Sequence, residues 1–223
     1  MVEPGSAPKG APVRSGIYIA VIGDVVGSRS VSDRAEFQQQ LAAAIDSVNR
    51  RFPETVAARF VLTVGDEFQG LLASTDNIVR ILASLRSMVH PVELRFGLGV
   101  GPLATPLRPE ALGMDGPCFQ LARIGIERAE QRETPVEVEA NVLAEPFTIY
   151  ALLFGALRRL WTEKQRQVID LAMTGREGKE IASQLSISPP AVTQHLQAAS
   201  WNQLEEATRS WEQALASVHR QAS

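Results

Sequence analysis

The chain has 223 residues, a formal net charge of -3 and a single cysteine. Its content of 45% hydrophobic and 21% charged residues is ordinary for globular proteins and excludes a disordered or fibrous chain. The balanced charge excludes binding to nucleic acid by charge alone, and the lone Cys118 excludes both an internal disulfide and a zinc site of several thiolates.

The first half of the chain alternates between strand-like and helix-like patterns. Residues 1–15 are rich in proline and glycine, so a disordered tail is expected there rather than a signal peptide. The β-branched run at 17–22 predicts a central strand that is buried on both faces. Alternating and 3.6-residue periodicities then predict a helix from Asp33 to about 51, strands at 59–64 and 68–73 joined by a tight hairpin, a helix at 78–89, a strand at 93–100, a helix at 119–130 and a short edge strand at 136–138.

The order strand, helix, strand, strand, helix, strand is that of the ferredoxin-like split βαβ unit. We therefore expect an α+β chain, with a ferredoxin-like mixed sheet over residues 16–141 and an all-α domain over 142–223. The longest nearly continuous apolar stretch, 147–157, falls well short of the ~20 residues of a membrane span and predicts a buried helix. A protein of the reducing cytoplasm, without a membrane partner, is expected.

Two aspartates stand beside glycines at strand ends. Asp24 and Asp66 would meet at one edge of the proposed sheet, where two carboxylates and a backbone carbonyl at Val25 suit Mg²⁺. A phosphate of a bound ligand would then be met by backbone N–H groups of Gly27 and Ser28 and by the Arg29 side chain. The alternative is that both Asp-Gly pairs are simple turns.

One further loop and one further strand each have two competing interpretations. Asp115 in the proline-rich loop would reach a ligand base, or would serve a plain turn. Gly97, Gly99 and Gly101 alternate along a strand, which favours close packing of a helix on that strand over a dinucleotide fingerprint.

The last third of the chain predicts a helix-turn-helix over residues 178–199. Ser188 is a natural N-cap, and Val192 and Leu196 would face the core. Outward-facing Thr193, Gln194 and Gln197 would then read base edges. The second helix has no lysine or arginine, so phosphate contacts would come from Lys164, Arg166, Arg176 and Lys179. A protein-interaction module is the alternative.

A 3-4 stripe of apolar side chains follows the helix-turn-helix. It predicts either core packing or the seam of a homodimer. The residues of this stripe are Trp201, Leu204, Thr208, Trp211, Leu215 and Val218.

Four short motifs resemble nucleotidyl cyclases. Asp24-Val25-Val26-Gly27 and Thr63-Val64-Gly65-Asp66 are similar to the two metal motifs of class III nucleotidyl cyclases, and Arg95 to Pro102 is similar to a later strand of that family. Gly65-Asp66-Glu67-Phe68 also resembles the GGDEF motif of diguanylate cyclases. The resemblance implies a Mg²⁺ and nucleotide site built on Asp24 and Asp66.

The sequence departs from the cyclase pattern at the positions that select the base and stabilise the transition state. Leu62 stands at the base-selecting position, and Gln120 and Ile124 stand where the family has an asparagine and an arginine. Arg123 lies one residue early and is the only candidate for a catalytic role. These departures put cyclisation in doubt.

The whole chain resembles the SatD family of bacterial proteins through its opening GDVVGSR, its central GDEFQGLL and its C-terminal helix-turn-helix. The C-terminal helix-turn-helix also resembles those of LuxR-type regulators and sigma region 4. The leading hypothesis is a DNA-binding regulator whose cyclase-like domain takes a Mg-nucleotide or another phosphate ligand. The alternatives are an enzyme that transforms a nucleoside triphosphate and a non-catalytic protein-interaction module.

Overall fold

The computed structural model describes residues 16–27, 33–63, 65–141 and 145–222. The expected tail at 1–15, together with Ser28 and Arg29, lies outside these residues. The sheet is formed by β1 (Ile17–Val25), β2 (Val56–Leu62), β3 (Phe68–Leu72), β4 (Leu94–Pro102) and β5 (Val136–Ala140). The helices are α1 (Arg34–Arg51), α2 (Ile78–Val89), α3 (Pro117–Arg132), α4 (Glu145–Leu160), α5 (Glu163–Met173), α6 (Gly178–Leu185), α7 (Pro189–Ala198) and α8 (Trp201–Ala222).

The strands form one mixed sheet in the order β2-β3-β1-β4-β5. The first four pair antiparallel, which is the ferredoxin-like arrangement, and β5 adds in parallel to β4. The predicted α+β class and the central position of the first strand are confirmed. The expected tight hairpin between β2 and β3 is confirmed, because Leu62 pairs with Phe68 and the Thr63 amide donates a hydrogen bond of 2.8 Å to the Glu67 carbonyl. The first strand of this hairpin begins earlier than expected, at Val56.

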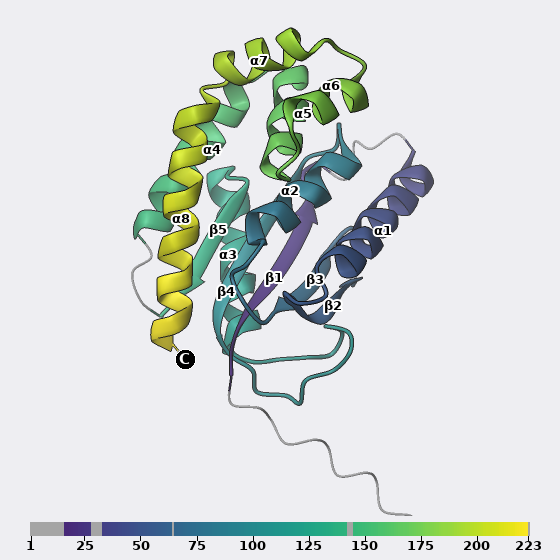
Figure 1. The fold of residues 1–223 in the computed structure, drawn as a ribbon. Helices are drawn as coiled ribbons and strands as arrows, with labels where there is room; N and C mark the ends of the chain where they lie inside the picture. The colour runs from purple at the N-terminus through teal and green to yellow at the C-terminus, as the bar shows by residue number, and fades with distance from the viewer. Residues whose placement is uncertain (1–15, 28–32, 64, 142–144, 223) are drawn as a thin grey trace, which may run out of the picture.

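Helices cover both faces of the sheet (Figure 1). On one face, α1, α2, α4 and α8 enclose the larger core, which includes Phe68, Phe96 and Trp211. On the other face, α3 lies across β4 and β1 over a smaller core around Ile22 and Phe119. Alternate residues of β1 belong to the two cores, so successive side chains of this strand point to opposite faces.

The alternating glycines of β4 let α3 approach the sheet closely, as the sequence pattern predicts. A Cβ atom built on Gly97 or Gly99 would overlap backbone atoms of α3, at Ala122 and Ile126 for Gly97 and at Cys118 and Ala122 for Gly99. Only a residue without a Cβ allows this helix-to-strand distance.

The C-terminal helices share the core of the sheet. The larger core runs without a break from the strands through Phe147, Phe154, Leu204, Trp211 and Leu215. The stripe on α8 thus packs within its own chain; Trp211 contacts the rings of Phe147 and Tyr150. Among the described residues, no helix has the length and apolarity that a membrane span requires.

Candidate functional site

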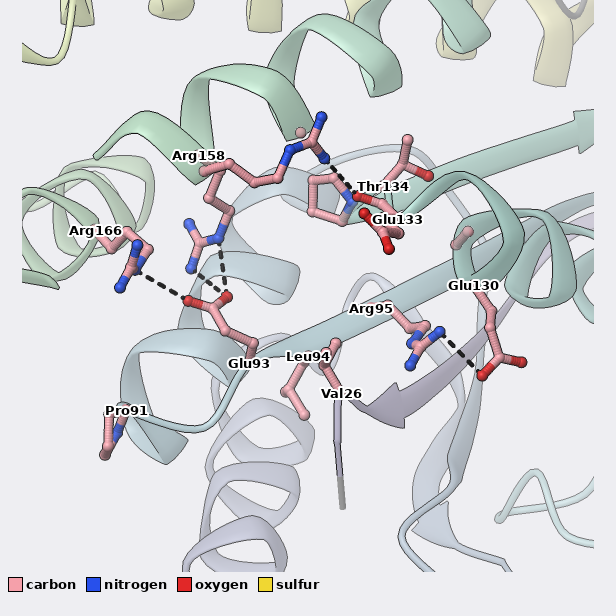
Figure 2. A pocket seen from close by; sticks show the side chains of 14 residues that line it. Val26, Pro91, Glu93, Leu94, Arg95, Glu130, Glu133, Thr134, Arg158 and Arg166 are labelled. Atoms are coloured by element: carbon pink, nitrogen blue, oxygen red, sulfur yellow. Dashed lines mark hydrogen bonds and ion pairs between the residues drawn. The ribbon is translucent and has the colours of Figure 1, made fainter. Parts of the chain in front are cut away.

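Asp24 lies near the end of β1, directly opposite Arg95 in the antiparallel pairing with β4. Their side chains form an ion pair of 3.6 Å from Nε to Oδ2, and Nη1 of Arg95 lies 3.3 Å from Glu130 of α3 (Figure 2). The Arg95 side chain is 13% exposed and that of Asp24 is 35% exposed. Strand register therefore fixes Asp24 at an arginine on the α3 face of the sheet.

Asp66 belongs to the loop between β2 and β3, and its partner comes from α1, which covers the face of the sheet opposite α3. Nη2 of Arg34, the first residue of α1, donates a hydrogen bond of 3.0 Å to Oδ2 of Asp66. The Asp66 side chain is only 7% exposed, whereas Arg34 is largely exposed. Because Gly23 pairs with Phe68, Asp66 and Asp24 lie at the same end of the sheet, as predicted, but they contact arginines on opposite faces.

Glu67, in the loop between β2 and β3, contacts α3 on the same face of the sheet as Asp24. It accepts two hydrogen bonds from the guanidinium of Arg123, of which the Nη2–Oε1 bond is 2.7 Å long. Both Glu67 and Arg123 act electrostatically on Asp24. The structure thus places the candidate Arg123 within electrostatic range of Asp24, and its direct partner is Glu67, which the sequence analysis did not single out.

The Asp24 carboxyl has a pKa above its ordinary value. Partial burial is the main cause, and the negative charges of Glu130 and Glu67 add to it. A hydrogen bond with the backbone of Val25 and the charge of Arg95 act in the opposite direction and offset part of the shift. A divalent cation at this end of the sheet would relieve the same repulsion.

The raised pKa predicts the sign of a stability change. The folded state disfavours the charged Asp24, so the wild type loses stability as pH rises from the ordinary aspartate pKa through the raised one. In EDTA at neutral pH, the melting temperature of Asp24→Asn should therefore be equal to or higher than that of the wild type. The difference between the two melting temperatures should become smaller as the pH falls below about 4. Thermal melts across this pH range check it; a neutral-pH melting temperature clearly below wild type would contradict it.

The other predicted ligand residues divide between the two ends of the sheet. Gly27 follows β1 with φ at +67°, at the Asp24 end. Asp115 and Gln120 lie at the N-terminal end of α3, beside the end of β4 that is remote from Arg95. Asp115 Oδ1 accepts a hydrogen bond from the Gly116 amide, which favours the turn interpretation. Neither Asp115 nor Gln120 is brought near Asp24.

The donor set at the Asp24 end fits Mg²⁺ only after a rearrangement. No three histidine, cysteine, aspartate or glutamate side chains are grouped as metal ligands within the described residues. A magnesium ion would rest on Asp24 and Asp66, with a carbonyl of the β1 end as a third ligand. Arg34 must first release Asp66, because its guanidinium takes the place beside that carboxylate that a cation would need.

Sequence reasoning missed the charged residues that surround the aspartates. Arg95 carries a signal, since strand pairing places it opposite Asp24, whereas Glu130 and Arg34 carry none without the tertiary structure. It also missed Arg158 of α4, which is buried between Glu93 and Asp170. Arg158 lies in the last turn of α4 beside Arg159, where basic side chains are common, so the sequence carried no signal of its burial.

The fold and the site define an α+β chain in which a ferredoxin-like sheet, with acidic and basic side chains gathered at one end, is continued by packed helices. The chain belongs to the SatD family, whose family model matches residues 18–212. No functionally curated protein matches the sequence.

Solved structures that resemble the chain include guanylyl cyclase domains and an adenylyl cyclase. The catalytic core of a rhodopsin-guanylyl cyclase in complex with ATPαS is 16% identical, with a TM-score of 0.40 over 51% of this chain and 72% of that one. The guanylate cyclase domain of RhGC from Catenaria anguillulae in complex with GTP is 16% identical, with a TM-score of 0.41 over 51% and 73%. A bacterial light-regulated adenylyl cyclase is 14% identical, with a TM-score of 0.40 over 57% and 76%.

Proposed function

We propose that this protein is a DNA-binding regulator of the cytoplasm. In this proposal α5, α6 and α7 form a helix-turn-helix unit that binds DNA. The Asp24 end of the sheet binds a Mg-nucleotide or another phosphate ligand as effector. In Figure 1, α5 to α7 lie above the end of the sheet at which β1 finishes, so the two proposed sites lie on the same side of the molecule.

The observation that carries the DNA-binding part is the exposed polar face of α7. Val192 is buried in a small core with Val168 and Ile181, which holds α5, α6 and α7 together. Ser188 caps α7 by accepting a hydrogen bond from the Ala191 amide. The side chains that point away from this core, where a DNA groove would be met, are Thr193, Gln194 and Gln197.

The candidate phosphate contacts are few. Lys179 is exposed, and Lys164 and Arg176 are half-buried. Arg166 is engaged elsewhere: it donates a hydrogen bond of 2.8 Å to the Trp161 carbonyl and lies 3.3 Å from Glu93. Residues 162–199 hold four basic and four acidic side chains, so the unit has no excess positive charge and its DNA affinity should depend on base contacts.

Ligand binding is supported by the arginine that neighbours Asp66. In the absence of ligand, Arg34 neutralises Asp66 from the start of α1. A Mg-nucleotide could replace this contact with two others, because the cation can bind the Asp66 carboxylate and a phosphate oxygen can accept hydrogen bonds from the Arg34 guanidinium. The ion pair therefore neutralises Asp66 when no metal is bound, and it would be replaced by the two new contacts when a Mg-nucleotide binds.

The first test is stabilisation by Mg²⁺ with ATP or GTP. A ligand that binds only the folded state should add about 2.7 kcal/mol at ~100 times its dissociation constant. Asp24→Asn and Asp66→Asn should each abolish this increase because they remove a metal ligand. Chemical denaturation with and without Mg-nucleotide measures it, and Asp46→Asn, an exposed aspartate of α1, is the matched control. An unchanged ligand effect in both variants would overturn the metal site.

The second test is a salt titration on a DNA site selected from random sequence. Gln194→Ala or Gln197→Ala should cost ~1 to 3 kcal/mol on the preferred site and little on random DNA, because base contacts specify and phosphate contacts position. Lys179→Ala should instead weaken binding to all sequences alike. The slope of log affinity against log salt should be about -3 per monomer if Arg166 keeps its ion pair and about -4 if it is released, and twice that for a dimer.

Gln203→Ala on α8 is the control for the glutamine variants, since Gln203 is exposed and lies outside the proposed DNA-binding unit. A protein that shows no sequence preference at any salt concentration would not be a regulator of this kind. The helical unit would then be better described as a protein-interaction module.

A further inference from the structure

A cavity of about 580 Å³ lies between the sheet and the C-terminal helices (Figure 2). Its walls come from the end of β1, the start of β4, the ends of α3 and α4, and α5. Four arginines line it, namely Arg95, Arg158, Arg159 and Arg166. We call it the arginine cavity. Its volume lies within the range of small-molecule sites, which is ~300 to 1,000 Å³.

The arginine cavity has two charged sides with an apolar floor between them. On one side Glu93 receives Arg158 and Arg166, and on the other Arg95 faces Glu130, as Figure 2 shows. Val26 and Leu94 lie between the two sides in Figure 2, and Pro135 also lines the cavity. This combination suits a ligand that has an apolar body and an ionised group.

The lining carries more positive than negative charge. Its four arginines stand against three carboxylates, those of Glu93, Glu130 and Glu133. Behind the lining, Arg158 is also bonded to Asp170, and Arg86 lies close enough for the two guanidinium groups to repel each other. Burial, followed by this repulsion, lowers the pKa of Arg86 to about 10. The excess of one arginine therefore holds for the lining itself, and Asp24 also pairs with Arg95 from outside the lining.

Two of the lining guanidinium groups carry buried nitrogen atoms that lack a hydrogen-bond partner. These are Nε of Arg95 and Nε of Arg166, one on each charged side of the cavity. Each has a carboxylate oxygen within 4 Å but not in hydrogen-bonding geometry. Buried donors of this kind are uncommon and cost free energy until an acceptor reaches them.

We propose that the arginine cavity binds a small organic acid, with one carboxylate or phosphate group on an apolar body. The ionised group takes hydrogen bonds from the cavity's arginines, and the apolar body lies on the floor between the two charged sides. Arg159 is the arginine best placed to respond. Its Nη1 donates to the Glu133 carbonyl at 3.1 Å, and the side chain is otherwise exposed. A carboxylate or phosphate is a stronger acceptor than that carbonyl.

This site differs from the proposed nucleotide site in needing no metal. The test therefore uses the full chain in EDTA, with phenyl phosphate and phenylacetate as the two anionic probes and benzyl alcohol as the uncharged one. Isothermal titration should show binding of at least one anion and none of the alcohol. Binding of only one anion identifies which ionised group the cavity takes and supports the proposal.

The variants locate the binding. Arg159→Gln and Arg95→Gln should each weaken the affinity for the bound anion about tenfold, the loss of a charge-assisted hydrogen bond. Arg209→Gln, an exposed arginine of α8, is the matched control and should change nothing. Arg159→Gln removes a largely exposed side chain, so it should fold even if Arg95→Gln does not.

Binding of neither anion would overturn the inference, and so would equal binding of benzyl alcohol or an affinity that Arg159→Gln leaves intact. Because nucleotide and Mg²⁺ are both absent, these outcomes do not depend on whether the proposed nucleotide site exists. A protein that binds Mg-ATP but no small acid would retain the proposed function and lose this inference.

Discussion

Gly99→Ala is expected to lower the free energy of unfolding by about 3 kcal/mol, near the upper end for overpacking a core. The added Cβ would overlap the Cys118 carbonyl oxygen and the Ala122 amide nitrogen, which are backbone atoms of α3. No rotamer change can relieve such an overlap, so α3 would have to move away from β4. Urea denaturation of the wild type and the variant measures the loss.

Two other glycines calibrate this result. Gly101→Ala should cost less, because its Cβ would lie 3.2 Å from the Cys118 nitrogen. Gly178→Ala should be nearly neutral, since the nearest atom to its Cβ is a methyl group of Val192 at 3.9 Å. If Gly99→Ala remained within about 1 kcal/mol of the wild type, the close approach of α3 to the sheet would be wrong.

Arg158→Met is expected to cost about 3 to 5 kcal/mol, the range for removing one partner of a buried ion pair. Arg158 donates hydrogen bonds of 2.8 Å to both carboxylate oxygens of Asp170, and Nε and Nη2 contact Glu93 at 3.0 and 2.9 Å. The Asp170 side chain is 2% exposed, so the variant leaves a carboxylate buried without its partner. Chemical denaturation at neutral pH measures the loss.

The double variant Arg158→Met with Asp170→Leu measures how much of the loss in stability comes from the interaction between these two residues. Because the double variant removes both members of the buried pair and leaves neither without its partner, it should be less destabilised than the sum of the single variants. Arg209→Met on the surface of α8 should change stability by no more than about 0.5 kcal/mol. Strictly additive single effects would show that Arg158 and Asp170 are not coupled.

Local patterns were sufficient to predict the sheet. The apolar run at 17–22 identified the central strand, and the period of α2 reproduced its bounds, Ile78–Val89. The predicted strand at 136–138 was too short because Glu137 and Glu139 interrupt the apolar pattern. Both are nonetheless buried on the α3 face, where they pair with Arg132 and Arg128. Alternation alone cannot show that a charged residue has a buried partner.

For the candidate site, the sequence could predict which residues lie at the ends of the strands, but not which side chains they contact. Motif spacing placed Asp24 and Asp66 at one end of the sheet, and the register confirms that placement. Which arginine each carboxylate contacts depends on the side of the sheet that α1 and α3 cover. That choice is set by tertiary packing, so Arg34 and Glu130 could not be found from the sequence.

The continuous core of sheet and C-terminal helices has a consequence for how a signal can travel. Trp211 and Leu215 of α8 lie in the same apolar cluster as Leu98 and Val100 of β4. A hinged reorientation of the helical part would expose this cluster to water, at about 25 cal/mol for each Å² of apolar surface. A signal between the Asp24 end of the sheet and α7 must therefore be carried by small displacements of side chains and helices within the shared core. For the same reason, the protein should unfold in one transition rather than in two.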